Sequence, residues 1–167
     1  MLCLRHATPD DLEAIEELET VSFPPEEAAD RTRLQERLAI YPECFWLLFD
    51  EKKLLAYSCG LATECRDLAD EMYANASLHE KNGAWQMLFS VCTDPMHRGE
   101  GLAHHVLSEV IAESCVRKRA GIVLTCKEAL VPFYREFGFA DEGVSDSTHG
   151  GQVWHQMRLH LGERNKA

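Results

Sequence analysis

Residues 90–103 (SVCTDPMHRGEGLA) hold the residue types best suited to binding a ligand. They join an apolar run to an amphipathic stretch, so we predict a glycine-rich turn between a strand and a helix. Gly99 and Gly101 allow the backbone to approach a ligand closely and to adopt positive φ. The first amides of a helix favour a phosphate, and Arg98 adds a bidentate donor. In an acidic chain this arginine is best explained by an anionic ligand.

Three kinds of turn bind phosphates in this way, and two of them do not fit. A dinucleotide-binding fingerprint requires a third glycine where this chain has His104, and it normally opens the fold. A Walker loop requires Gly-Lys followed by Ser or Thr, which this turn lacks. The remaining pattern, Arg98, Gly101 and Ala103, resembles the pyrophosphate-binding R-x-x-G-x-A signature of the GNAT acetyltransferases. An ordinary glycine-rich helix start is the alternative that this segment alone leaves open.

A second motif strengthens the resemblance. Residues 128–139 (EALVPFYREFGF) resemble the GNAT motif in which a short helix carries a tyrosine and ends in Phe-Gly-Phe. Within that superfamily the chain is most similar to the arylalkylamine (serotonin-type) N-acetyltransferase group. The most specific part runs over residues 124–139, with Thr125 and Cys126 ahead of Ala-Leu-Val-Pro-Phe-Tyr. Phe23 and Pro24 fall where that group has its substrate-binding loop.

The resemblance implies acetyl-CoA as the acetyl donor and direct attack of an amine on the thioester. Tyr134 would be the general acid that protonates the departing thiolate. The alternative is that Tyr134 is an aromatic residue of the core with no part in the reaction. The backbone N–H of Leu88 would stabilise the oxyanion. The cofactor-binding residues that the resemblance implies are Val91, Cys92, Thr93, Arg98, Gly99, Glu100, Gly101, Leu102, Ala103, His104 and Tyr134.

The acceptor site is where the chain departs from the subgroup. The serotonin enzymes have two histidines on the central strand, and the matching positions here are Met87 and Phe89, so no histidine base can act from there. The remaining candidates for a base are His79, Glu64, Asp67 or Glu71 from the acidic excursion, or bulk-connected water, and a dedicated base can also be missing. Two roles stay open for Trp85, which either forms part of an aromatic slot for the acceptor or simply fills the core. The predicted substrate-binding residues are Phe23, Pro24, Met87, Phe89, Thr125, Cys126 and Phe133.

Covalent catalysis and metal chemistry are both poorly supported. Cys126 sits in the acceptor region, but no histidine beside it in the sequence would activate its thiol. The seven cysteines include no C-x-x-C pair, and their odd number does not suit a disulfide framework. We therefore predict free thiols, no metal site and a reducing, cytoplasmic location.

The elements that position these residues follow from periodicity. We predict a strand at 2–6, a helix that begins after Thr8, and a second helix at 26–39. A hairpin of strands at 44–49 and 54–61 follows, then an acidic excursion at 63–82 and a strand at 84–93. A helix at 102–115, a strand at 121–126, a short helix at 131–137 and a last strand pair near 139 and 152–161 complete the order. This order predicts a mixed α/β GNAT fold: about seven mainly antiparallel strands with one central parallel pair, flanked by about four helices.

The length, composition and charge of the chain limit its domain organisation and the classes of partner that it can bind. A chain of 167 residues with 46% hydrophobic and 27% charged residues fits one globular domain, which we place at 1–161 with a polar tail at 162–167. The net charge of −11 argues against nucleic-acid binding, and no apolar run is long enough to span a membrane. We expect a small primary amine and acetyl-CoA as partners, in a monomer or homodimer. A protein or peptide N-terminal acetyltransferase and a CoA-binding module without turnover are the alternative functions.

Overall fold

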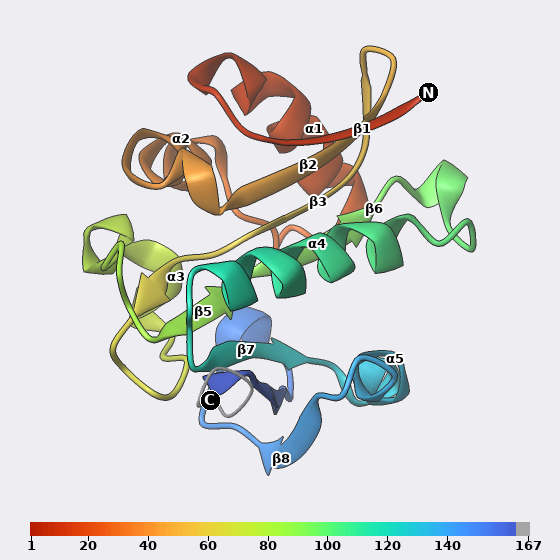
Figure 1. The fold of residues 1–167 in the computed structure, drawn as a ribbon. Coiled ribbons are helices and arrows are strands. Elements are labelled where there is room, and N and C mark those ends of the chain that lie inside the picture. Colours follow the sequence, from red (N-terminus) through yellow and green to blue (C-terminus); the bar gives the residue numbers. More distant parts are fainter. Residues whose placement is uncertain (163–167) are drawn as a thin grey trace. The chain divides into compact units, whose positions relative to one another are not determined.

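The computed structural model describes residues 1–162, so the predicted polar tail lies outside the described residues except for Gly162. The chain divides into two compact units. Figure 1 labels helices and strands of both. The first comprises Met1–Gly60 and Ser90–Val110, and the second comprises Leu61–Phe89 and the chain from Ile111 onward. Each unit contains its own sheet.

The first unit is built on a four-stranded antiparallel sheet in the order β1-β2-β3-β6. Its strands are β1 (Leu2–His6), β2 (Phe45–Asp50), β3 (Lys53–Cys59) and β6 (Ser90–Thr93). Helix α1 (Leu12–Ser22) packs against β3, β6 and helix α2 (Arg31–Ile40). As the apolar spacing predicts, Leu12, Ile15 and Leu18 are buried on α1.

Both helices of the first unit begin at a polar cap. A 3₁₀ turn (Pro9–Asp11) leads into α1, and its Asp11 carboxylate accepts the Thr8 N–H at 2.8 Å. The second helix begins at Arg31, five residues later than the sequence predicts. The Pro24 carbonyl closes a separate turn before it, and the Asp30 side chain caps α2 by accepting the Arg33 N–H at 2.9 Å.

The second unit is built on a five-stranded sheet in the order β4-β5-β7-β9-β8. Its strands are β4 (Ala62–Thr63), β5 (Trp85–Leu88), β7 (Gly121–Cys126), β8 (Ala140–Val144) and β9 (His155–His160). The β5–β7 pair is parallel and the other pairs are antiparallel, which confirms the predicted single parallel pair. The acidic excursion contains a short helix, α3 (Glu71–Ala74), and the tyrosine motif forms α5 (Val131–Arg135).

The predicted strand at 84–93 is interrupted at Phe89. Residues before the break pair with β7 in the second unit, and residues after it pair with β3 in the first. Helix α4 (Leu102–Val116) also crosses the boundary, because it begins in the first unit and ends in the second. The predicted mixed α/β class and element order are confirmed. No helix within residues 1–162 has both the length and the apolarity of a membrane span.

Candidate active site

Strand β6 carries the residues predicted to hold the acyl-carrying arm of the donor. It pairs with β3 through Tyr57 opposite Cys92 and Ser58 opposite Val91, and it is the last strand of its sheet. Within that sheet only one edge of β6 is paired, so its other edge presents amides and carbonyls that an extended amide ligand can pair with. The Cys92 side chain is buried, and burial raises the pKa of its thiol. The Cys92 thiol is therefore not available to a ligand in solution.

The turn after β6 is built for close backbone approach. Asp94 begins it by accepting the Met96 N–H at 2.9 Å, and its own N–H donates to the Leu55 carbonyl at 2.7 Å. Gly99 and Gly101 have φ values of 80° and 78°, which L residues rarely adopt. A Cβ at either position would meet no atom within 4 Å. The space beside both glycines is therefore open.

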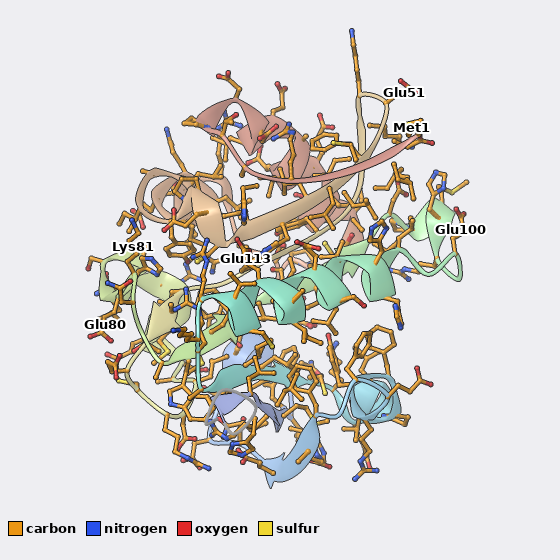
Figure 2. The ribbon with its side chains drawn as sticks, in the orientation of Figure 1. Met1, Glu51, Glu80, Lys81, Glu100 and Glu113 are labelled. Atoms are coloured by element: carbon orange, nitrogen blue, oxygen red, sulfur yellow. The ribbon has the colours of Figure 1, made fainter. Side chains whose placement is uncertain are left out.

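The side chains around this turn divide by role. Arg98 is exposed, and no other residue in the described part of the chain forms an ion pair with it. Glu100, which Figure 2 labels, lies 3.2 Å from Nδ1 of His97. His104 is on the first turn of α4, with Nδ1 3.4 Å from the Ser108 hydroxyl. The arginine and the first amides of α4 are therefore the groups suited to an anion.

Tyr134 lies in α5, in the second unit. Pro132 occupies the first turn of this helix, and Gly138 ends the motif with a φ of 99°. The Tyr134 ring is 5% exposed and meets the edges of Phe133 and Phe139, with centroids 5.1 and 5.8 Å away. The apolar rings fix the direction of the phenol, as a proton donor requires.

The carboxyl end of β7 gathers three residues from distant parts of the chain. The hydroxyls of Tyr73 and Thr125 lie 2.9 Å apart, and the Tyr73 ring lies 4.8 Å from that of Phe89. Thr125 and Phe89 are predicted substrate-binding residues, and the structure brings both against Tyr73. Sequence analysis misses Tyr73 because no motif marks a tyrosine in the acidic excursion.

A histidine accompanies Cys126 across the sheet, although none lies beside it in the sequence. His155 is its Cα partner across the β7–β9 pair, and His155 Nδ1 lies 3.1 Å from Asp141. Burial, with the Asp141 charge adding to it, raises the pKa of the Cys126 thiol to about 11. A neutral thiol is a poor nucleophile, so the arrangement does not favour a covalent acetyl-cysteine.

A stack of aromatic rings continues from Tyr73 into the connection between β8 and β9. His149 lies 4.6 Å from Tyr73 at an interplanar angle of 9°, and Trp154 lies 5.9 Å from His149. Lys127 Nζ is 5.9 Å from the Trp154 ring centroid. The sequence carries no signal for this stack, because its rings come from the acidic excursion and from the connection between β8 and β9.

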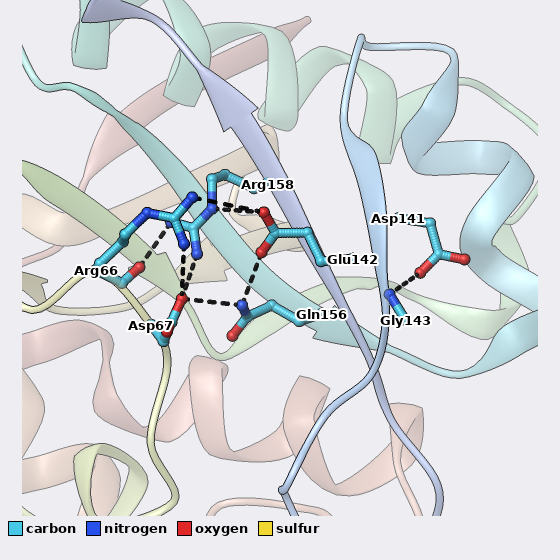
Figure 3. A network of polar contacts seen from close by, with 7 residues as sticks. All are labelled: Arg66, Asp67, Asp141, Glu142, Gly143, Gln156 and Arg158. Atoms are coloured by element: carbon cyan, nitrogen blue, oxygen red, sulfur yellow. Dashed lines mark hydrogen bonds and ion pairs between the residues drawn. The ribbon is translucent and has the colours of Figure 1, made fainter.

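The acidic excursion is tied to the sheet of the second unit. The fully buried Arg158 side chain donates to the Glu142 carboxylate at 2.9 Å and to the Asp67 carboxylate (Figure 3). Glu64 accepts the Ala84 N–H at 3.1 Å, and His79 Nδ1 accepts the Ala62 N–H at 3.0 Å. Three of the four proposed bases therefore hold the excursion in place.

The other predicted residues lie at different depths. Met87 and Leu88 are buried in β5, opposite Val123 and Leu124, while Phe133 is half-buried beside Tyr134. Phe23 and Pro24 follow α1 in the first unit. The Arg158 guanidinium covers the Trp85 ring at 4.7 Å, which favours the core reading of Trp85 over an open aromatic slot.

Comparison with known proteins identifies related sequences. A family model described as "Acetyltransferase (GNAT) domain" matches residues 67–161, which is more than half of the chain. Serotonin N-acetyltransferase of Mesocricetus auratus is 27% identical over 164 residues, covering 94% of this chain and 76% of the relative.

Solved structures show the same fold. The loading GNATL domain of CurA from Lyngbya majuscula has a TM-score of 0.82 at 16% identity, covering 98% of this chain and 100% of that domain. The ribosomal-protein-S18-alanine N-acetyltransferase of Escherichia coli has a TM-score of 0.73 at 17% identity, covering 96% and 94% of the two chains.

Proposed function

Because this chain belongs to the GNAT acetyltransferase family, whose members use acetyl-CoA, we propose that its acetyl acceptor is a small primary arylalkylamine. The observation that carries this acceptor class is the likeness to serotonin N-acetyltransferase over 94% of the chain. The unpaired edge of β6 and the open glycine turn with its exposed arginine support the donor site. These residues are suited to an extended amide arm followed by a pyrophosphate.

The donor is assigned to residues on and after β6. Val91, Cys92 and Thr93 pair by their backbones with the pantetheine arm. The backbone amides from Gly99 to His104 receive the pyrophosphate, and Arg98 binds it from beside the turn. Glu100 takes part only through its N–H, because its carboxylate would repel an anion.

The chemistry is assigned to residues of the second unit. The amine attacks the thioester carbon while the Leu88 N–H stabilises the oxyanion. The carbon–sulfur bond then breaks, and the Tyr134 phenol gives its proton to the thiolate. Thr125, Cys126, Met87, Phe89 and Phe133 of this unit are assigned to the acceptor, and the resemblance to the arylalkylamine group adds Phe23 and Pro24.

Two experiments test this function in turn. CoA should raise the unfolding temperature, since a ligand at about 100 times its Kd stabilises the native state by about 2.7 kcal/mol, whereas NAD should not. Tryptamine, phenethylamine, spermidine and a short peptide with N-terminal alanine are then incubated with acetyl-CoA, and the products are identified by mass. Acetylation of the aryl amines supports the proposal. Acetylation of the peptide alone would instead favour a protein N-terminal acetyltransferase, and no product with any acceptor would favour a CoA-binding module.

A further inference from the structure

An alkylamine acceptor is an ammonium ion at neutral pH, and it must lose a proton before it can attack. The two strand positions that carry histidines in the arylalkylamine group are Met87 and Phe89 here. Most of the alternative bases in the acidic excursion are held in structural contacts. Glu71 and the titratable groups of the second unit outside the excursion therefore stay as candidates for the base.

His149 is the histidine that the second unit brings to the carboxyl end of β7. Its ring stacks face to face on Tyr73, with centroids 4.6 Å apart. The Tyr73 hydroxyl in turn lies 2.9 Å from the Thr125 hydroxyl. Phe89 packs on Tyr73. The next residue in the chain, Ser90, begins the strand that is assigned to the donor. The imidazole is thus one ring away from the hydroxyl pair of the acceptor region.

Asp70 and two aromatic rings lie around His149. Asp70 accepts hydrogen bonds from the Ser147 hydroxyl and the Thr148 N–H, at 2.5 and 3.0 Å, and so holds the turn that ends at His149. Partial burial opposes ionisation of Asp70, but these hydrogen bonds and the nearby His149 hold its pKa below the ordinary value. The aromatic faces of Tyr73 and Trp154 also attract a cation. The positive charge of Lys127, whose Nζ lies 5.9 Å from the Trp154 ring centroid, would oppose a positive charge on the His149 ring.

The backbone of His149 is also held in place. Its carbonyl accepts the Trp154 indole N–H at 2.7 Å, and its N–H donates to the Ser147 hydroxyl at 3.3 Å. A base must have such a defined position to meet the same proton in each catalytic cycle.

We propose that His149 is the general base of the acetyl transfer, an assignment that rests on the proposed function. A ring nitrogen of His149 takes one proton from the acceptor ammonium, and the freed nitrogen lone pair attacks the thioester carbonyl. The nitrogen then loses a second proton, and Tyr134 gives one proton to the CoA thiolate, so these two transfers cancel in the overall reaction. His149 then releases its proton to water, so one ammonium and one acetyl-CoA yield one amide, one CoA thiol and one proton.

The test compares two acceptors of nearly the same shape. Phenethylamine is protonated at neutral pH, whereas O-benzylhydroxylamine carries an oxygen in place of one methylene and is neutral there. His149→Gln should lower kcat/KM for phenethylamine by about 100-fold, the range of general base catalysis. It should change kcat/KM for O-benzylhydroxylamine by less than about threefold, because that amine needs no base. His105→Gln, on an exposed position of α4, is the matched control and should act like the wild type on both.

Comparison of the two amines also separates a catalytic role of His149 from a structural one. H149Q can use only the neutral minority of phenethylamine, so its rate with this amine should fall more steeply with acidity than the wild-type rate does. An equal loss with both amines would assign His149 a structural role and overturn the proposal, as would an unchanged rate with phenethylamine. Wild-type protein that acetylates neither amine would instead contradict the acceptor class itself.

Discussion

Tyr134 has the setting of a proton donor, because its phenol is buried and its ring is held on two sides by Phe133 and Phe139. Tyr134→Phe removes only the hydroxyl, so the packing of the ring is retained. We expect kcat to fall by about 100-fold, the contribution of a positioned acid, with little change in the Kd for acetyl-CoA. Stopped-flow turnover and calorimetric binding measure the two quantities. An unchanged kcat would remove Tyr134 from the chemistry.

Arg98 is the second residue whose role can be tested alone. Arg98→Ala should weaken CoA binding by about 10-fold, because a charge-assisted contact with the pyrophosphate is lost. Arg98→Lys should recover part of the affinity through its charge. Arg31→Ala is the control, since Arg31 is an exposed arginine of the same unit that pairs with Glu16 at 3.0 Å. Titration calorimetry with CoA reports the effect, and equal affinities for R98A and R31A would contradict the assignment.

At the scale of elements, Glu19 connects three parts of the first unit. It is 2% exposed on α1, and its carboxylate accepts the Ala29 N–H and the Ser90 hydroxyl, each at 2.9 Å, and the Tyr57 hydroxyl. Ala29 ends the segment that begins with the predicted acceptor residues Phe23 and Pro24. One buried carboxylate therefore holds this loop, strand β3 and the first residue of β6 to the helix.

Glu19→Gln should lower the free energy of unfolding by about 1–3 kcal/mol, because the amide group brings N–H donors to a buried position already filled with donors. Glu16→Gln is a matched control on the same helix, and it should cost less than about 1 kcal/mol, because its ion pair with Arg31 is exposed. Urea denaturation measures both changes. If the two variants lose the same stability, Glu19 does not hold the elements together.

The elements that local sequence determines are the ones that could be predicted. The turn at Gly99 and Gly101 adopts the expected positive φ. The tyrosine helix ends at Arg135, two residues before the predicted end, and Gly138 follows it with a positive φ. The start of α2 could not be placed, because it depends on the Asp30 cap rather than on the charged run before it. The break at Phe89 also has no local signal, since it arises where one apolar run joins two sheets.

The acceptor region was predicted only in part, for a similar reason. Thr125 and Phe89 follow from the family motifs, but Tyr73 reaches Thr125 across 52 residues. The contact of Asp70 with Ser147 spans 77 residues, so the placement of His149 depends on tertiary structure alone. Motifs identify the residues that a family shares, whereas the residues that replace a missing base must be found in the structure.

The molecule as a whole has a net charge of −11 and therefore carries many carboxylates. Several of them accept hydrogen bonds in the folded protein. Their pKa values lie below the ordinary range because hydrogen bonds stabilise the charged form, from the Arg5 guanidinium at Asp11, the Met96 N–H at Asp94 and the Gly143 N–H at Asp141.

This arrangement predicts acid sensitivity. A lowered pKa in the folded state adds stability above the ordinary value of 3.8, and this stability is lost as the pH falls through the folded-state values. The contribution of these groups should therefore be constant from about pH 7 to about pH 5, and the unfolding temperature should drop below about pH 4. Circular dichroism melts across this range check the expectation. A melting temperature that holds or rises below about pH 4 would contradict it.

The acceptor preference of the wild-type protein tests the central claim most directly. At saturating acetyl-CoA, kcat/KM is measured for phenethylamine, for tryptamine and for a peptide with N-terminal alanine, by following CoA thiol release and the mass of each product. We expect both aryl amines to exceed the peptide by at least about 100-fold, which corresponds to about 2.7 kcal/mol of transition-state binding. A peptide acetylated as fast as either amine, or CoA release without an acetylated amine, would contradict the assignment.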